Sequence, residues 1–103
     1  MRSEALRKDI FRAVSDPSRR KMLEMLLRSD RTVRELQRPF GISQPGASQH
    51  LRVLSDVRLV LVRREGRHRY YALNAAPLAK ITRWIKRLQS GGDSTRRPRP
   101  ARG

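Results

Sequence analysis

The side chains best suited to binding chemistry lie in the segment SQPGASQHLR, from Ser43 to Arg52. Its glutamine, serine and arginine side chains can hydrogen bond to base edges and phosphate oxygens of nucleic acids. On a helix they would share one face, while Ala47, Leu51 and Leu54 would share the opposite, apolar face. The candidate nucleic-acid contacts in this segment are Ser43, Gln44, Ser48, Gln49, His50 and Arg52.

An ordinary solvated helix is the alternative for this segment, but such a helix more often carries Glu and Lys. The position of the segment, after a turn and before a basic hairpin, favours the binding interpretation. His50 lies at the edge of the apolar stripe, so a structural hydrogen bond and a phosphate contact both stay open for it.

A second group of candidates lies on an arginine-rich hairpin. The β-type runs 59–64 and 68–73 flank Glu65-Gly66-Arg67, where glycine suits the turn. The tip of such a hairpin can contact phosphate or enter the minor groove, and an edge strand kept soluble by its charge is the alternative. Tyr70 and Tyr71 must point to opposite faces, so one is expected in the core. The candidate contacts on the hairpin are Arg64, Arg67, His68 and Arg69.

Catalytic and metal sites find no support in the sequence. The chain has no cysteine and only two histidines, which are too few ligands for a zinc site. It has neither a Gly-rich phosphate loop nor a nucleophile with a base beside it. We therefore predict a protein that is not an enzyme and that holds no metal and no cofactor.

Two predicted helices begin the chain. Apolar residues at helical spacing predict the first over residues 4–14. Asp16 suits the N-cap of the second helix and Pro17 suits its first position. A broad apolar face follows, and this helix is expected to end at Ser29-Asp30.

A short third helix is predicted before the candidate binding helix. Thr32 and Glu35 form a capping-box pattern at its start, and Pro39 cannot continue it. Gly41 then supplies a sharp turn, and the fourth helix begins around Ser43.

The first helix and a last helix, which starts near Leu78 and ends at Ser90-Gly91-Gly92, carry more apolar surface than one small domain needs. This surplus favours a two-fold interface between subunits, and the alternative is that the residues only cover the domain's own core. The candidate interface residues are Leu6, Ile10, Leu78, Ile81, Trp84 and Ile85.

The predicted order of elements is α-α-α-α-β-β-α, mainly helical with one small hairpin. This order is a winged helix-turn-helix, in which the second helix of the pair enters the major groove. We expect a DNA-binding and dimerisation domain over residues 1–90 and a disordered, basic Arg/Pro tail over residues 91–103.

The charge balance agrees with a nucleic-acid partner. The 103 residues include 25 Lys and Arg against 9 Asp and Glu, a formal net charge of +16. So basic a chain attracts polyanions, most commonly nucleic acid. We expect a cytoplasmic homodimer without a membrane segment that binds double-stranded DNA. One alternative is a coating or RNA-binding protein that is indifferent to sequence. A third possibility is a winged helix used only for protein contacts.

Three stretches resemble the ArsR-type bacterial winged-helix repressors, namely FRAVSDPSRRKMLEMLL, TVRELQRPFGISQPGASQHLRVL and LVRREGRHRYYAL. The similarity runs from about Ile10 to Leu88. It implies a homodimer built on the first and last helices, with two recognition helices in successive major grooves of an imperfect palindrome. It also implies DNA contacts at the candidate positions from Ser43 to Arg52 and at Arg67 and His68 of the wing.

The chain departs from the pattern of this family at two places. Metal-sensing members carry a cysteine pair on the third helix or His and Asp ligands on the last helix. Residues 33–38 contain no cysteine, and residues 78–89 contain no His, Asp or Glu. The chain thus resembles the branch that does not sense metals, whose members respond to a partner protein or another effector, or bind constitutively. Arg58 stands where the family usually has glycine, so this turn either has a left-handed residue, at a cost of about 1 kcal/mol, or another geometry.

Overall fold

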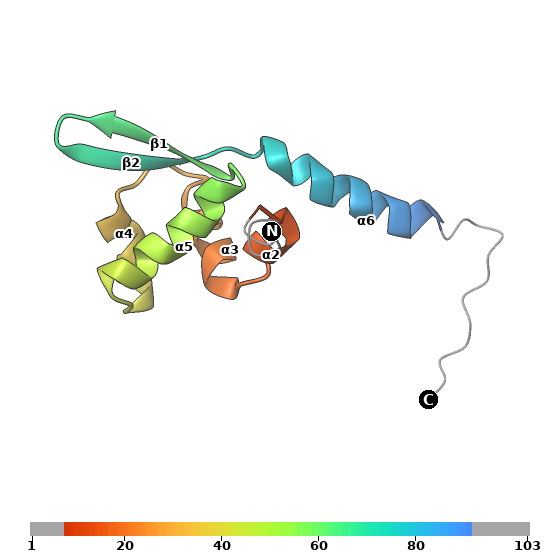
Figure 1. The fold of residues 1–103 in the computed structure, drawn as a ribbon, viewed down its shortest axis with the longest axis horizontal. Helices are drawn as coiled ribbons and strands as arrows, with labels where there is room; N and C mark the ends of the chain where they lie inside the picture. Colours follow the sequence, from red (N-terminus) through yellow and green to blue (C-terminus); the bar gives the residue numbers. More distant parts are fainter. Residues whose placement is uncertain (1–7, 92–103) are drawn as a thin grey trace.

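The computed structural model describes residues 8–91 and contains helices and a hairpin in the predicted order (Figure 1). Its elements are α2 (Ile10–Ala13), α3 (Pro17–Met25), α4 (Val33–Gln37), the 3-10 helix η1 (Arg38–Phe40), α5 (Gln44–Asp56), β1 (Val60–Glu65), β2 (His68–Leu73), η2 (Ala76–Leu78) and α6 (Ala79–Gly91). The first helix, predicted over residues 4–14, spans only Ile10–Ala13 in the described part, because Asp9 is its N-cap in an extended conformation. Helices α2 to α5 pack together beside the hairpin, and α6 extends away from them (Figure 1). The structure therefore confirms a mainly helical winged helix-turn-helix. No helix among residues 8–91 has the length and apolarity needed to cross a bilayer.

The core lies between α3, α4, α5 and the base of the hairpin. The predicted inward stripe of α5 is confirmed, since Ala47, Leu51 and Leu54 are all but fully buried. Burying one leucine side chain contributes about 1.5–3 kcal/mol, so this stripe fixes how α5 sits in the domain. The other buried apolar residues are Ile10, Ala13, Met22, Leu26, Leu36, Val57, Leu59, Val60 and Tyr71.

The helix starts agree with the predicted caps. The Asp16 carboxylate accepts a hydrogen bond of 3.0 Å from the Arg19 amide, with Pro17 in the first turn. Thr32 and Glu35 form the reciprocal capping box, with hydrogen bonds of 3.3 and 2.9 Å. Pro39 lies in η1, beyond the end of α4.

The predicted end of α3 at Ser29-Asp30 is wrong, because the helix stops at Met25. The Leu26 amide donates to the carbonyls of both Met22 and Leu23, which tightens the last turn. Leu27 is 71% exposed, so no further apolar burial extends the helix.

The hairpin has a two-residue turn. Strands β1 and β2 are antiparallel and pair as far as Glu65 and His68, which leaves Gly66 and Arg67 between them. Gly66 has φ +64°, as the first central position of a type II′ turn requires. Tyr71 is the core tyrosine, and it exchanges backbone hydrogen bonds of 3.0 and 2.7 Å with Arg31.

Arg58 adopts the left-handed conformation, with φ +61°. It follows α5 in a Schellman motif, in which the Arg58 amide donates to Ser55 and the Leu59 amide donates to Leu54. Leu54 and Leu59 are both buried, as this motif favours, and the Asn74 side chain donates to the Arg58 carbonyl at 2.7 Å. Hydrogen bonds and burial therefore hold a conformation that a non-glycine residue disfavours.

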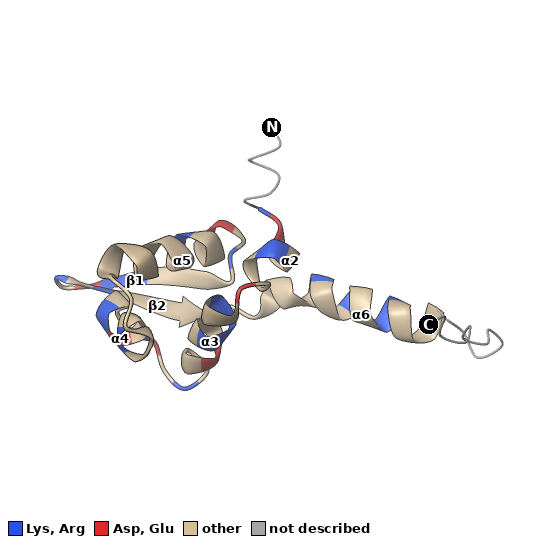
Figure 2. Cartoon of the chain, turned by 90° about the horizontal axis from the view of Figure 1, so that it is seen from below, with Lys and Arg blue, Asp and Glu red and all other residues tan. Residues whose placement is uncertain are grey.

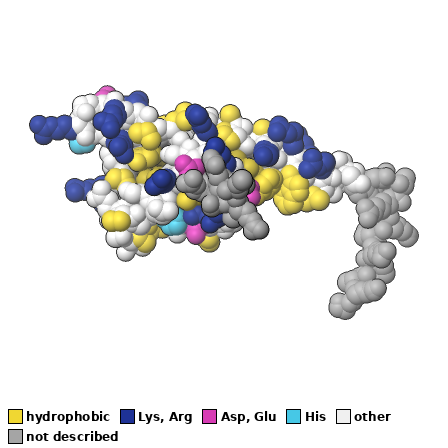
Figure 3. Space-filling view, viewed as in Figure 1, with side chains coloured by type: hydrophobic (Ala, Val, Ile, Leu, Met, Phe, Trp, Pro, Cys, Tyr) yellow, Lys and Arg dark blue, Asp and Glu magenta, His cyan; other side chains and the backbone are white. Residues whose placement is uncertain are grey.

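Helix α6 has an apolar side and a basic side (Figure 3). Trp84 and Ile85 are 43% and 42% exposed, whereas Leu78 and Ile81 pack partly against the core. Ile10 is 4% exposed, so we reassign it from the predicted interface to the core of its own subunit. The predicted interface residue Leu6 lies outside the described residues, as does the predicted tail, apart from Gly91, which is the last residue of α6.

Candidate nucleic-acid interface

The polar face of α5 is exposed along its whole length. Gln44, Ser48, Gln49 and Arg52 are all exposed, opposite the buried stripe. Ser43 is the N-cap, and its hydroxyl accepts a hydrogen bond of 3.1 Å from the Gly46 amide. Four of the predicted contacts thus lie on one accessible surface, while Ser43 orders the start of the helix.

The turn before α5 fixes the direction in which this face points. Gly41 has φ +61°, a left-handed conformation that favours glycine. The Gln37 side chain donates to the Ile42 carbonyl at 3.0 Å, and Ile42 packs against the core. These contacts connect α4 rigidly to the following helix.

His50 lies apart from the exposed face. It is half-buried, and its Nδ1 lies 3.2 Å from Nη1 of Arg19. A guanidinium can only donate, so the imidazole nitrogen accepts this hydrogen bond. This hydrogen bond is the structural contact that the sequence left open for His50, and its phosphate contact stays a prediction.

The wing carries a dense positive charge. Arg64, Arg67, His68 and Arg69 are exposed, and with Gly66 they line a hollow of about 220 Å³ near the tip. Figure 2 shows Lys and Arg at this tip and on α3, α4 and α6. Arg64 and Arg69 are direct cross-strand partners, so two like charges stand side by side.

Arg63, by contrast, is engaged within the protein. Its guanidinium binds Glu65 at 2.6 Å and Asp30 at 3.0 Å, and it lies over the Tyr70 ring, 4.9 Å from the centroid. The hydrogen bond that Arg63 donates to Glu65, followed by the one it donates to Asp30, raises the pKa of Arg63. This cluster connects the wing to the loop after α3.

A cleft of about 570 Å³ separates the wing from α4 and α5. It brings together Gln44 and Ser48 of α5 and three adjacent residues of the wing, Arg67 to Arg69. No acidic residue lines it. Its complete lining is Thr32, Val33, Arg34, Gln44, Ser48, Arg67, His68, Arg69 and Tyr71.

Two polar residues of this cleft were missed by the sequence interpretation. Thr32 was assigned only a capping role, and Arg34 was assigned none, although a basic residue in the first turn of α4 was a usable signal. Three predicted contacts, Gln49, Arg52 and Arg64, are exposed but lie outside the cleft. The candidate interface is therefore the cleft together with the exposed remainder of α5 and the wing tip.

No group of three or more His, Asp or Glu side chains within residues 8–91 is arranged to hold a metal ion.

Known proteins are similar to this chain in sequence and in fold. A family model described as bacterial regulatory protein, arsR family, matches residues 16–61. The transcriptional repressor SdpR of Bacillus subtilis is 35% identical over 86 residues, which are 84% of this chain and 96% of that protein. A probable mercury resistance operon repressor of Streptomyces lividans is 41% identical over 71 residues, which are 69% of this chain and 57% of that repressor.

A crystal structure of an ArsR family transcriptional regulator superposes with a TM-score of 0.76 at 33% identity, and the match covers 82% of this chain and 93% of that one. The family model, the full-length relative and the solved structure agree with the helix pair and wing described above. The chain belongs to the ArsR family of bacterial regulatory proteins and is a DNA-binding transcriptional regulator.

Proposed function

We propose that the protein is a homodimeric transcriptional repressor that occludes a promoter by binding a palindromic operator, and that it does so without sensing a metal. The observation that carries this proposal is the acid-free cleft between α5 and the wing, where hydrogen-bonding and cationic side chains converge. The relative SdpR is a transcriptional repressor, which supports repression as the outcome of binding.

The two parts of the interface have different tasks. Gln49 and Arg52, on the exposed face of α5, would bind base edges in the major groove, where Arg pairs with guanine and Gln with adenine. Arg34 and the wing arginines would contact the phosphates on either side and fix the position of the helix. Sequence preference would thus come from α5 and most of the affinity from the wing.

The Arg64–Arg69 pair supports a polyanionic partner. Like charges directly opposite on neighbouring strands destabilise a hairpin, and neither guanidinium makes an ion pair within the described chain. A phosphate between them would turn this repulsion into two favourable contacts.

The apolar side of α6 supports the dimer. Trp84, Ile85 and Leu88 are 43%, 42% and 61% exposed, and Trp84 packs edge-on against Phe11 of α2 with ring centroids 5.3 Å apart. Pairing this side with its copy would bury the patch and duplicate the recognition helix. The two half-sites would then be one helical turn apart, about 34 Å.

The dimer is tested by sedimentation equilibrium of two double variants. Ile85→Gln with Leu88→Gln should give a monomer, because the apolar contact is lost. Lys86→Gln with Arg87→Gln changes the basic side of the same helix and should leave the dimer intact. Equal association of both variants would assign dimerisation to another surface.

The absence of metal sensing rests on the residues themselves. The mercury-resistance relative shows that metal resistance occurs among similar proteins, but this chain has no cysteine. Operator affinity should therefore be the same with zinc, with mercury and with a chelator. A change of affinity on metal addition would refute this part of the proposal.

The DNA-binding assignment is tested by selecting bound fragments from genomic DNA and comparing variants on the selected site. Replacing Gln49 and Arg52 with Ala should weaken binding to that site by about tenfold or more and leave binding to random DNA nearly unchanged. Lys21→Ala on α3 is an exposed control and should change neither affinity. If the wild type and the double variant both bind the selected site and random DNA equally well, the protein is instead a coating protein.

A further inference from the structure

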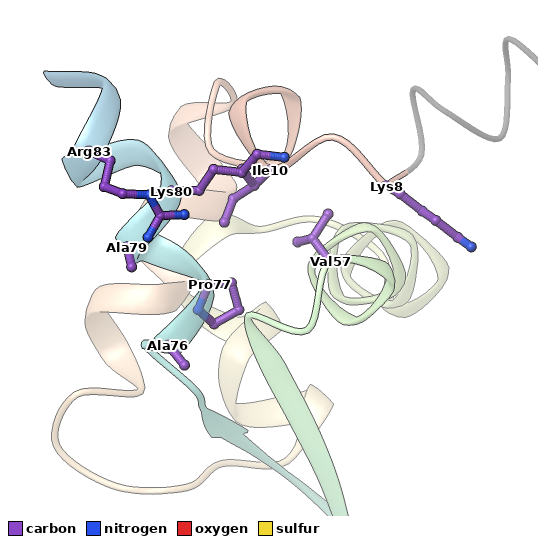
Figure 4. A pocket seen from close by; sticks show the side chains of 8 residues that line it. All are labelled: Lys8, Ile10, Val57, Ala76, Pro77, Ala79, Lys80 and Arg83. Atoms are coloured by element: carbon purple, nitrogen blue, oxygen red, sulfur yellow. The ribbon is translucent and has the colours of Figure 1, made fainter. Parts of the chain in front are cut away.

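A second cavity lies at the C-terminal end of α5, beside α2 and the start of α6. It is open to solvent, has a volume of about 350 Å³ and is bordered by α2, the end of α5, η2 and the start of α6 (Figure 4). Its lining residues are Lys8, Ile10, Val57, Ala76, Pro77, Ala79, Lys80 and Arg83. None of them is a predicted DNA contact.

The cavity has an apolar wall and a cationic rim. Ile10 and Val57 are core residues, 4% and 8% exposed, and Pro77 lies beside them (Figure 4). Lys80 and Arg83 come from one turn of α6 and make no hydrogen bond or ion pair in the described part of the chain. No Asp or Glu lines the cavity.

These features specify one class of ligand. A carboxylate can accept two parallel hydrogen bonds from a guanidinium and pair with an ammonium group at the same time. An apolar body would cover the side chains of Ile10, Val57 and Pro77. The volume of about 350 Å³ lies at the lower end of the range for small-molecule sites, about 300–1,000 Å³, which favours a compact ligand.

We propose that this cavity binds a small organic anion, a monocarboxylate with a compact aliphatic or aromatic body. Lys80 and Arg83 bind the carboxylate, and the apolar wall selects the body over inorganic anions.

The site has a direct connection to both functional parts of the molecule. Val57 is the C-cap of α5, the candidate recognition helix, and Lys80 and Arg83 lie on the helix of the candidate dimer interface. A ligand here contacts both elements at once, so it can favour one relative position of the two. This regulatory consequence rests on the proposed function, whereas binding itself does not.

Binding is therefore measured without DNA, by calorimetric titration of the full-length protein with benzoate and hexanoate. We expect saturable binding with a dissociation constant of about 1 mM or tighter. Benzamide and hexanamide have the same bodies without the charge and should bind about tenfold more weakly. Absence of binding by both acids, or equal binding by the amides or by inorganic phosphate, overturns the proposal.

Two charge-matched double variants locate the site. Lys80→Gln with Arg83→Gln should lower affinity for benzoate about tenfold or more, while Lys86→Gln with Arg87→Gln removes the same charge elsewhere on α6 and should keep it. Methyl NMR should show a benzoate-dependent shift at Ile10 and none at Ile42. Equal loss in both variants, or a shift at Ile42 alone, would place binding elsewhere.

The regulatory consequence is tested on the DNA site selected from genomic fragments. Saturating benzoate should change wild-type operator affinity and leave that of the Lys80→Gln, Arg83→Gln variant unchanged. If benzoate binds and operator affinity stays constant, the regulatory consequence is refuted while the binding site stands. Failure of the protein to prefer any DNA site refutes the proposed function and leaves the calorimetric result intact.

Discussion

The Arg19 guanidinium donates to Nδ1 of His50 across 3.2 Å, and this contact joins α3 to α5, the candidate recognition helix. The same guanidinium donates to the Ala13 carbonyl at 2.7 Å and to the Arg12 carbonyl at 3.2 Å. One half-buried side chain therefore connects α2, α3 and α5. The orientation of α5 depends on this side chain as well as on the apolar stripe.

Arg19→Lys should lower the free energy of unfolding by about 1–3 kcal/mol, because an ammonium group cannot reproduce these diverging hydrogen bonds. Denaturant unfolding monitored by circular dichroism measures the change. Arg12→Lys is the matched control, since Arg12 is exposed and its side chain makes no hydrogen bond in the described chain. A loss of the same size in the control would show that the geometry around Arg19 is unimportant.

The Asp16 cap should make stability depend on acid pH. Burial raises the pKa of Asp16, but the hydrogen bond from the Arg19 amide and the positive charge of Arg19 outweigh it, so the pKa lies below its usual value. A carboxyl whose pKa is depressed by folding stabilises the protein above its unfolded pKa, and the contribution disappears as the pH falls through the folded pKa.

Asp16→Asn keeps a good N-cap but lacks the charge, so it should be less stable than the wild type at about pH 7, and this difference should shrink towards about pH 3. Asp16→Ala removes the cap and should cost about 0.5–2 kcal/mol at neutral pH. Unfolding midpoints in urea at both pH values measure these differences. Parallel pH profiles for the wild type and Asp16→Asn would contradict the role of the carboxylate.

Arg58→Gly should stabilise the fold. Arg58 is left-handed at φ +61°, and glycine removes a penalty of about 1 kcal/mol while keeping the backbone hydrogen bonds of the motif. The melting temperature should rise by about 4–8 °C. Arg52→Gly is the control, because glycine within α5 should instead cost about 1 kcal/mol. No rise for Arg58→Gly would mean that the arginine side chain contributes as much as its conformation costs.

Arg69→Gln should stabilise the free protein and weaken DNA binding together. Removing the charge opposite Arg64 relieves repulsion of about 0.2–1 kcal/mol and deletes one phosphate contact. Thermal unfolding and DNA titration of the same sample measure both effects. If both stability and affinity fall, the arginine pair serves the fold and not the ligand.

Arg67 and Arg63 should differ in their effect on the salt dependence of DNA binding. Arg67→Ala should reduce the slope of log K against log salt by about 1, because Arg67 neutralises one phosphate in the proposed interface. Arg63→Ala should leave the slope unchanged, since Arg63 is occupied by Asp30, Glu65 and Tyr70. Equal reductions of the slope would mean that Arg63 leaves its partners when DNA binds.

The features predicted correctly from sequence are those set by neighbouring residues. The Asp16 and Thr32 caps, the turn at Gly41 and the buried stripe of α5 each depend on residues within a few positions of one another. The end of α3 was predicted wrongly because the apolar run continues through Leu26 and Leu27, so the sequence shows no stop signal at Met25, where the helix ends. Helix ends depend on which residues find a buried surface, and local pattern does not show this.

The sequence by itself determined the element order, the two faces of α5, the basic wing and the lack of thiolate ligands, since periodicity, capping residues and composition are local properties. Only the tertiary structure decided that Ile10 belongs to the core, that Arg63 pairs with Asp30 and that His50 binds Arg19. The last two contacts join residues 33 and 31 positions apart. Such pairs form only when packing brings distant helices and strands together, and the same packing places Arg34 and the wing on opposite walls of one cleft.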